Sequence, residues 1–197
     1  LLRYKLKSDG GVGAKQWDAG IKLDNKAADT RSIWTAHVAL GTSLNNFTTS
    51  NANILRSELY SGSVMGTMSE TTQIINFTRG YDSFDEDKDG STIDERWKLA
   101  DIYHSNPVLV AKPNAGIDTS NKNSDDYYRH QNNYKAFKNK WSTRPVTILA
   151  GSNGGMLHAF SNVSGDEKWA FIPPSIIPKL RRVNGGQANK SISIYGV

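Results

Sequence analysis

Residues 144–174 read RPVTILAGSNGGMLHAFSNVSGDEKWAFIPP. Three short runs of β-branched, aliphatic and aromatic residues stand out within them: Val146–Ala150, Met156–Phe160 and Lys168–Ile172. The segments between the runs, GSNGG and SNVSGDE, are rich in the residues that turns between antiparallel neighbours need. Pro173 ends the last run, because proline has no N–H to donate to a ladder. The pattern predicts three consecutive strands of one antiparallel sheet.

A fourth apolar run, Ser105–Ala111, precedes these three and completes a predicted four-stranded meander within residues 104–172. The first two strands are almost continuously apolar, which predicts burial on both faces, whereas the last two carry His158 and Lys168 and are expected nearer the rim. Such a gradient is typical of a β-propeller blade. The residues expected to pack between blades are Val108, Leu109, Ile148, Leu149, Leu157, Phe160, Trp169 and Phe171.

The N-terminal part repeats this theme less regularly. Leu2–Lys7 and Gln16–Leu23 flank a GGVG turn, Ser32–Leu40 is a third candidate strand, and Thr71–Phe77 fits a strand or a helix. The sequence therefore predicts an all-β fold of about two four-stranded antiparallel blades, with long loops and one short helical insertion. Since a closed ring needs roughly four blades or more, we expect residues 1–197 to form part of a larger propeller.

A long polar insertion, residues 112–142, separates the first two strands of the meander. Its aromatic residues Tyr127, Tyr134, Phe137 and Trp141 are seven, three and four residues apart, which places them on one face of a helix. We interpret this stripe as packing the insertion onto the sheet, because aromatic stripes usually belong to a core. Binding of a peptide or glycan is the alternative.

The segment 82–96, DSFDEDKDGSTIDER, contains seven carboxylates in a chain whose net charge is +5. Asp85, Asp87 and Asp89 alternate and are followed by Gly90. Side chains one, three and five positions along such a loop converge on one concave surface, and the glycine permits the sharp turn. Oxygen ligands in this spacing suit a hard cation, so the segment predicts a calcium site. The alternative is a solvated acidic hairpin tip.

The rest of the expected calcium site comes from the end of this segment. Ser91 stands where a backbone carbonyl would contribute, and Asp94 or Glu95 would close the site. Arg96 occupies the twelfth position, where an EF-hand has its closing acid, so a free-standing calcium loop fits better. The predicted ligands are Asp85, Asp87, Asp89, Ser91, Asp94 and Glu95, with Asp82 and Glu86 pointing outward.

The amino-acid composition limits which other functions are possible. With no cysteine, disulfides, zinc thiolates and thiol nucleophiles are excluded. The four histidines stand in no metal-ligand spacing, and no oxyanion-donor arrangement is identifiable, so we expect no enzyme. No apolar run is long enough to span a membrane. Most basic residues are scattered, which favours a solvated surface over nucleic-acid binding.

Several runs together resemble a known family. RWKLADIYHSNPVLVAKP and RPVTILAGSNGGMLHAFSNVSGDEKWAFIPPSIIPKL, preceded in order by LRYKL, WDAGIKL, TRSIWT and INFTRGYD, resemble the C-terminal propeller of the PilC/PilY family of type IV pilus tip adhesins and biogenesis factors. The resemblance implies a modified quinoprotein-like β-propeller, exported through the periplasm and outer membrane to the pilus tip or bacterial cell surface. It also implies calcium in an acidic Asp-x-Asp-x-Asp loop.

The function that this resemblance implies is non-enzymatic: support of pilus assembly, adhesion and control of retraction. Its partners would be minor pilins or the remainder of the same adhesin, contacted through strand edges near Leu1–Lys7 and Ser191–Val197; the host or surface receptor stays unidentified. The alternative is a calcium-dependent pyrroloquinoline quinone (PQQ) dehydrogenase, since such enzymes use calcium and similar blades. A polar, glycine-punctuated loop should lie at the surface, which argues against a buried cofactor site.

Overall fold

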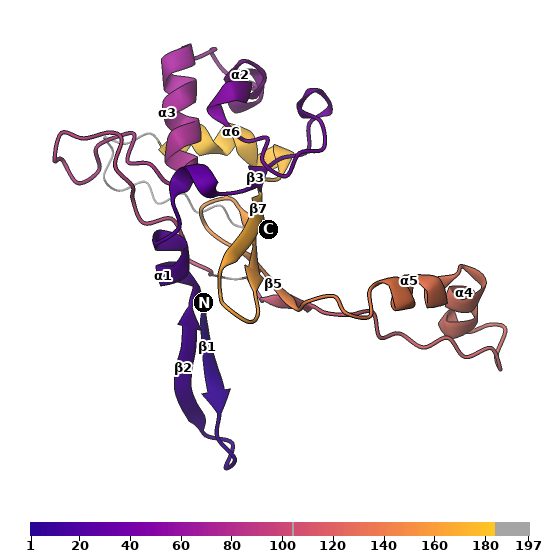
Figure 1. Cartoon of the computed structure of the whole chain (residues 1–197). Helices are drawn as coiled ribbons and strands as arrows, with labels where there is room; N and C mark the ends of the chain where they lie inside the picture. The colour runs from indigo at the N-terminus through magenta and orange to yellow at the C-terminus, as the bar shows by residue number, and fades with distance from the viewer. Residues whose placement is uncertain (104, 184–197) are drawn as a thin grey trace.

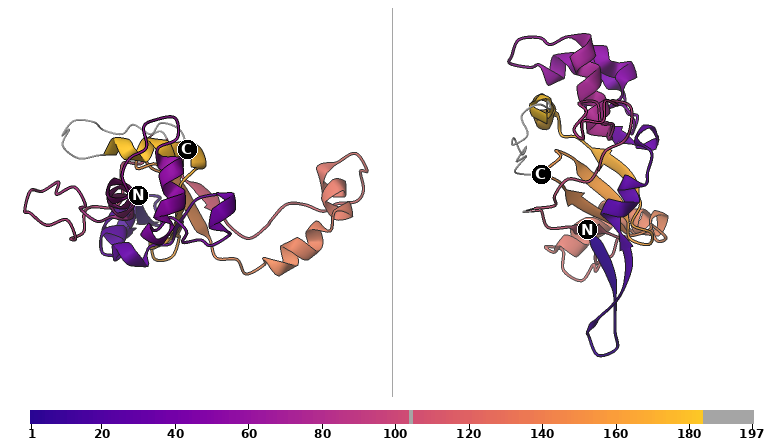
Figure 2. Two further views of the ribbon diagram at one scale, coloured as in Figure 1. Left: turned by 90° about the horizontal axis from the view of Figure 1, so that it is seen from above. Right: turned by 90° about the vertical axis from the view of Figure 1, so that its left-hand side faces the viewer.

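A computed structural model describes residues 1–103 and 105–183 of the chain. A five-stranded sheet lies at the centre, with helices α2, α3 and α6 beyond one end of it (Figure 1). Two segments project from this body, the hairpin β1–β2 and the helix pair α4–α5, as the further views also show (Figure 2). His104 and the predicted strand edge at 191–197 lie outside the described residues. No helix within the described ranges is long and apolar enough to cross a bilayer.

The central sheet contains the predicted meander. Strands β4 (Val108–Val110), β5 (Thr147–Gly151), β6 (Leu157–Ser161) and β7 (Glu167–Phe171) pair antiparallel in chain order, which confirms the four-stranded prediction. A fifth strand, β3 (Ile33–Trp34), joins parallel to β7, so the order is β3-β7-β6-β5-β4. The segment Ser32–Leu40, predicted as the third strand of the N-terminal part, thus contributes its strand to this sheet.

The predicted burial gradient across the meander was wrong. β6 is the middle strand of the five, and His158 within it is fully buried. β4 is an edge strand, where Val108 and Leu109 are 56% and 64% exposed. Burial follows the position of a strand in the sheet, and hydropathy does not report that position. His158 is tolerated inside because buried polar groups with hydrogen-bond partners are not costly.

The prediction of an all-β propeller was also wrong. The described residues contain six α-helices, and neither of their two sheets closes on itself. Helix α3 (Met68–Arg79) has a capping box between Thr67 and Glu70, a local signal that settles the strand-or-helix ambiguity of this segment. Helix α2 (Ala52–Leu59) was not predicted. Its apolar residues pack with those of α3, α6 and the sheet in the main core, which includes Ile33, Leu55, Leu59, Ile74, Ile75, Ile172, Ile177 and Leu180.

The N-terminal segment forms a hairpin and a helix in place of a second blade. Strands β1 (Leu2–Leu6) and β2 (Val12–Asp18) pair antiparallel. Helix α1 (Ala19–Asp24) follows at once, where the strand was expected to continue, because the Asp18 carboxylate accepts hydrogen bonds from the backbone N–H groups of Gly20 and Ile21. The remaining elements are α6 (Ile177–Leu180) and the 3-10 helices Ala28–Thr30, Val38–Leu40, Thr49–Asn51, Pro174–Ile176 and Arg181–Val183.

The polar insertion was predicted as one helix but forms two. Helix α4 (Asp125–Gln131) and helix α5 (Tyr134–Lys140) are separated at Asn133, whose φ of 58° is left-handed. Asparagine tolerates this conformation better than most residues, so the break has a local cause. The aromatic stripe also does not pack onto the sheet, since Phe137 is 44% exposed and both helices project from the body (Figure 1).

Four side chains that cross the sheet form one buried hydrogen-bonded network. The Arg31 guanidinium donates to both carboxylate oxygens of Glu167 at 3.0 and 2.9 Å. Glu167 Oε1 lies 2.8 Å from His158 Nδ1, and His158 Nε2 lies 3.0 Å from Ser152 Oγ. The last three groups have the order of a nucleophile–base–acid triad. Each of them is at most 4% exposed, however, so the network joins strands and offers a substrate no access.

The network makes stability depend on pH. Burial lowers the pKa of His158 below its ordinary value, although Glu167 opposes the shift. The unfolded histidine therefore binds a proton that the folded one does not, so stability should fall as the pH drops below about 6.5. We expect the free energy of unfolding in urea to decrease between pH 7.5 and 5.5. His158→Gln should flatten this slope, whereas His130→Gln, on the exposed helix α4, should leave it unchanged; a flat wild-type profile would contradict the prediction.

Candidate metal centre

The acidic segment forms a loop that is closed at its base. It begins after α3, and Tyr81 and Glu95 form an antiparallel bridge where its two ends meet. The backbone N–H of Asp82 donates to the carbonyl oxygen of Asp94 at 2.9 Å. The loop is thus anchored on the end of a core helix, and its two ends bring Asp82 and Asp94 side by side.

Hydrogen bonds from backbone to carboxylate shape the outer turn. The N–H of Gly90 donates to Asp85 Oδ1 at 3.2 Å, and the N–H of Ser91 donates to Asp89 Oδ1 at 2.7 Å. Gly90 has a φ of 85°, a conformation that favours glycine, as the sequence predicted for a sharp turn. Ser91 is held beside Asp89, and a ligand role for its carbonyl stays a prediction.

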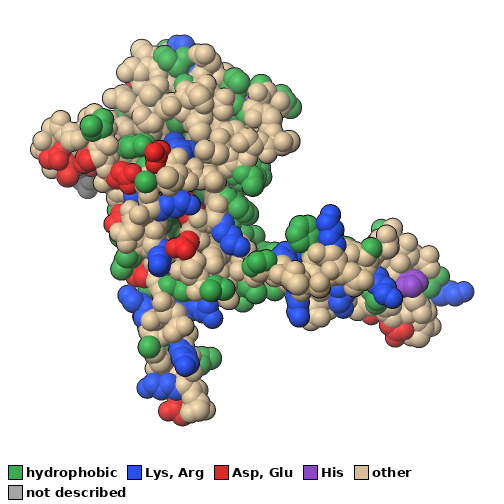
Figure 3. Space-filling view, in the orientation of Figure 1, with side chains coloured by type: hydrophobic (Ala, Val, Ile, Leu, Met, Phe, Trp, Pro, Cys, Tyr) green, Lys and Arg blue, Asp and Glu red, His purple; other side chains and the backbone are tan. Residues whose placement is uncertain are grey.

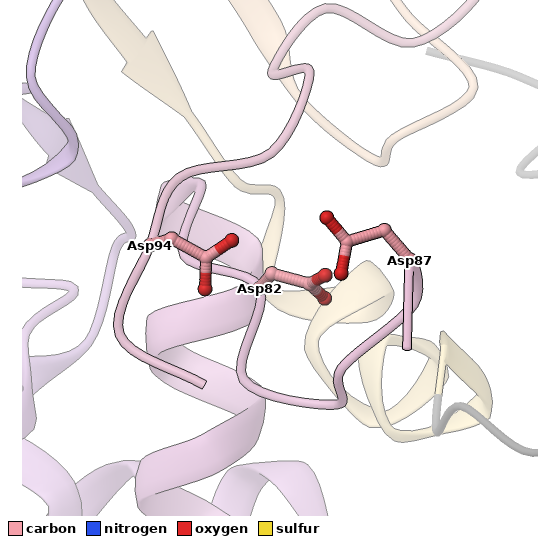
Figure 4. A group of neighbouring side chains, drawn as sticks. All are labelled: Asp82, Asp87 and Asp94. Carbon is pink, nitrogen blue, oxygen red and sulfur yellow. The ribbon is translucent and has the colours of Figure 1, made fainter. Parts of the chain in front are cut away.

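Two groups of carboxylates converge in this loop. Oxygen atoms of Asp85, Asp87 and Asp89 all lie within 4.8 Å of one another. Oxygen atoms of Asp82, Asp87 and Asp94 satisfy the same limit, and Figure 4 shows these three side chains gathered inside the loop. The structure therefore brings three other predicted carboxylates, those of Asp85, Asp89 and Asp94, close to Asp87, which belongs to both groups. On the surface, acidic side chains gather on the loop that projects beside α3 (Figure 3).

Among the described residues, the group of Asp82, Asp87 and Asp94 contains a carboxylate oxygen that has no hydrogen-bond partner. Asp94 Oδ1 is buried and accepts no hydrogen bond from the described residues. A buried unpaired carboxylate oxygen is costly, and a cation would remove that cost. Asp82, expected to point outward, is only 3% exposed, and its two oxygens accept from the N–H of Glu86 at 3.0 and 2.8 Å. That expectation was wrong, because the closed base of the loop turns Asp82 inward.

Glu95 and Glu86 lie outside both groups. Glu95 Oε1 accepts from the N–H of Ala28 at 2.7 Å, and Glu95 Oε2 lies 2.7 Å from Lys98 Nζ. Burial works to raise the pKa of Glu95, but the hydrogen bonds from Lys98 and Ala28 outweigh burial and lower it. Glu86 pairs with Arg96 at 2.8 Å. Glu95, a predicted ligand, instead fastens the base of the loop to the body.

Asp82 was not predicted from the sequence to be a member of a carboxylate group. Asp82 and Asp94 lie six residues on either side of Lys88, at the middle of the acidic segment. In a loop closed as a hairpin, residues placed symmetrically about the tip are opposite each other. That symmetry was the available signal for Asp82. The resulting set of oxygen atoms suits a hard divalent cation such as calcium better than a soft metal.

The fold and the loop together define a helix-capped β-sheet domain that carries an anchored acidic loop. Over 191 residues, 94% of its length, the chain is 31% identical to the type IV pilus biogenesis factor PilY1 of Pseudomonas aeruginosa strain UCBPP-PA14. Over 112 residues it is 32% identical to a PilY1 homologue of Xylella fastidiosa strain Temecula1. The chain belongs to the PilC/PilY family of type IV pilus biogenesis factors.

The chain spans only part of these relatives, 16% of the Pseudomonas protein and 9% of the Xylella protein. No family model matches it. No solved structure matches it either.

Proposed function

We propose that this chain is part of a type IV pilus biogenesis factor, placed at the bacterial cell surface near the pilus tip, where it supports pilus assembly, adhesion and control of retraction without catalysing a reaction. The observation that carries the proposal is the similarity to PilY1 along 94% of the chain. The partners are minor pilins or other parts of the same polypeptide.

Calcium is the ion that we propose for the acidic loop. Asp87 is common to both carboxylate groups, so it would hold the ion whether the other ligands were Asp82 and Asp94 or Asp85 and Asp89. Asp94 Oδ1 is buried and accepts no hydrogen bond from the described residues, which supports Asp82 and Asp94 as the other two ligands. Extracellular calcium modules bind with dissociation constants of roughly 0.1–1 mM, a range that calcium outside the cell can saturate. The ion would neutralise the loop and fix its shape beside α3.

Removing two carboxylates tests the calcium proposal. We expect Asp87→Ala combined with Asp89→Ala to abolish calcium binding in a calorimetric titration, because both carboxylate groups lose members. Circular dichroism should show the sheet and helices retained, since both residues are exposed. The matched control, Asp125→Ala with Asp166→Ala, removes two exposed carboxylates elsewhere and should bind calcium as the wild type does. Unchanged affinity in the loop variant would exclude this loop as the calcium site.

The pilus role is tested in the cell that encodes the protein. Deleting the gene should reduce the amount of pilin recovered by shearing, and the wild-type gene should restore it. A deletion strain with a normal quantity of functional pili would contradict the proposal. The non-enzymatic part is tested separately: pyrroloquinoline quinone is added to the purified protein, and alcohol-dependent dye reduction would show a quinoprotein dehydrogenase instead.

A further inference from the structure

The segment 112–144, which we call the basic arm, carries most of the net charge of the chain. It holds seven Lys or Arg against three Asp, a net charge of +4, in a chain whose total is +5. No carboxylate occurs between Asp126 and Asp166. The seven basic residues are Lys112, Lys122, Arg129, Lys135, Lys138, Lys140 and Arg144.

The basic arm has no core of its own. None of the described residues from 101 to 147 is buried, and neither α4 nor α5 contains a buried residue. Both helices lie away from the sheet in Figure 1 and in the left-hand view of Figure 2. Isolated helices of seven residues are marginal in water, because most helical stability comes from packing an apolar face. The arm lacks that packing within the described chain.

Helix α5 presents an apolar face with a basic border. Tyr134 and Phe137 lie in α5 and Trp141 caps its C-terminus; the three follow the i, i+3, i+7 spacing, and Phe137 and Trp141 are 44% and 39% exposed. Lys135 and Lys140 are exposed beside this face. Blue side chains border green ones along the arm in Figure 3. Anchors at these spacings, with charges at the border, are how an amphipathic helix binds in a groove.

We propose that the basic arm docks α5 into a groove of a pilus subunit, with an apolar floor for Phe137 and Trp141 and an acidic rim for the lysines. The inference rests on the proposed pilus function and names the docking element and the chemistry of its partner. Carboxylates on the partner complement the charge of the arm, and its groove buries the apolar face that the helices leave unpacked.

A nucleic acid fits the arm less well. Single strands bind by stacking bases on open aromatic rings. Phe137 and Trp141 are exposed, but Tyr134 is not open for stacking, because its ring lies 5.7 Å from that of Phe137 and its hydroxyl accepts from the N–H of Ala115 at 3.2 Å. A flexible polyanion would also give the two helices no groove in which to pack.

Crosslinking in piliated cells tests the docking. The photoreactive residue p-benzoylphenylalanine is placed at position 137 of the full-length protein, expressed from its own locus, and at position 163 as a control, since Val163 is 78% exposed on the body. We expect position 137 to give an adduct with a pilus subunit, at a peptide that contains Asp or Glu, and position 163 to give none. An adduct with nucleic acid or with another part of the same polypeptide would overturn the proposal. The absence of any adduct at position 137 would overturn it as well.

Charge reversal gives an independent readout. Lys135→Glu combined with Lys140→Glu should lower the yield of the adduct at position 137 by roughly tenfold. Charges at the edge of an interface steer the two partners together and fix their alignment. The matched control, Lys22→Glu with Lys168→Glu, reverses two exposed lysines outside the arm and should not change the yield. An unchanged yield in the arm variant would contradict the acidic rim. Pilin recovery in the deletion strain is measured separately, so the docking proposal can fail while the pilus function stands.

Discussion

Glu167→Ala should lower the free energy of unfolding by about 3–5 kcal/mol, the usual cost of leaving one partner of a buried ion pair unpaired. Glu167 is 3% exposed, and its carboxylate is the anion between Arg31 and His158. Burial works to raise its pKa, but hydrogen bonds from His158 and the charge and hydrogen bonds of Arg31 keep it well below the ordinary value. The alanine variant would leave the Arg31 guanidinium buried in the sheet without a counter-charge. Urea unfolding at pH 7 measures the loss.

Two further variants separate the buried charge from other effects of the substitution. Asp166→Ala changes the neighbouring residue, whose ion pair with Lys22 is exposed at 4.0 Å, and should shift the free energy of unfolding by less than about 0.5 kcal/mol. Arg31→Met combined with Glu167→Gln should be less destabilised than the two single losses predict together, because removing both charges leaves neither unpaired. Additive losses would show that shape, and not charge, sets the cost.

The sequence predicted the parts of the fold that local patterns determine. The four strands of the meander and their turns were placed correctly, because alternating apolar runs between Gly, Asn and Ser clusters are sufficient to define an antiparallel sheet. The addition of β3 beside β7 was missed, since it joins residues about 137 positions apart and leaves no local pattern. The helix α3 was ambiguous by periodicity and became clear only through its capping box.

The candidate site, too, was predicted only in part from the sequence. The alternation of Asp85, Asp87 and Asp89 before a glycine was visible in the sequence, and the structure gathers these three carboxylates. Asp82 and Glu95 exchanged their expected roles because both depend on the closed base of the loop. That base turns Asp82 inward and directs Glu95 to Ala28 and Lys98. The contact of Glu95 with Ala28 joins residues far apart in the chain and leaves no sign in residue spacing, whereas the symmetry of Asp82 and Asp94 about Lys88 was visible.

Arg79 connects the acidic loop to the N-terminal segment. It is the last residue of α3, is 5% exposed and forms no ion pair with any described residue. Its guanidinium donates instead to oxygen atoms of the chain between residues 28 and 47, and its own carbonyl accepts from Arg31 Nη1 at 2.7 Å. Burial, and then the charge of Arg31, lowers its pKa. The acceptors are the backbone oxygens of Ala28, Asp29, Arg31 and Phe47 and the side-chain oxygen of Asn45.

Arg79→Met should therefore destabilise the protein by at least about 3 kcal/mol in urea unfolding, because several buried acceptors lose their donor at once. Arg79→Lys should not restore stability, since an ammonium has three donors at one point and cannot span acceptors that a planar guanidinium reaches. The N-terminal segment that these bonds hold also includes Ala28, which binds Glu95 at the base of the loop. Calcium affinity should accordingly fall in Arg79→Met even under conditions where most molecules are folded. Arg56→Met, at a partly exposed arginine of α2, is the matched control and should retain wild-type calcium affinity. If Arg79→Met kept wild-type calcium affinity while losing stability, the loop would be independent of the hydrogen bonds between Arg79 and the N-terminal segment.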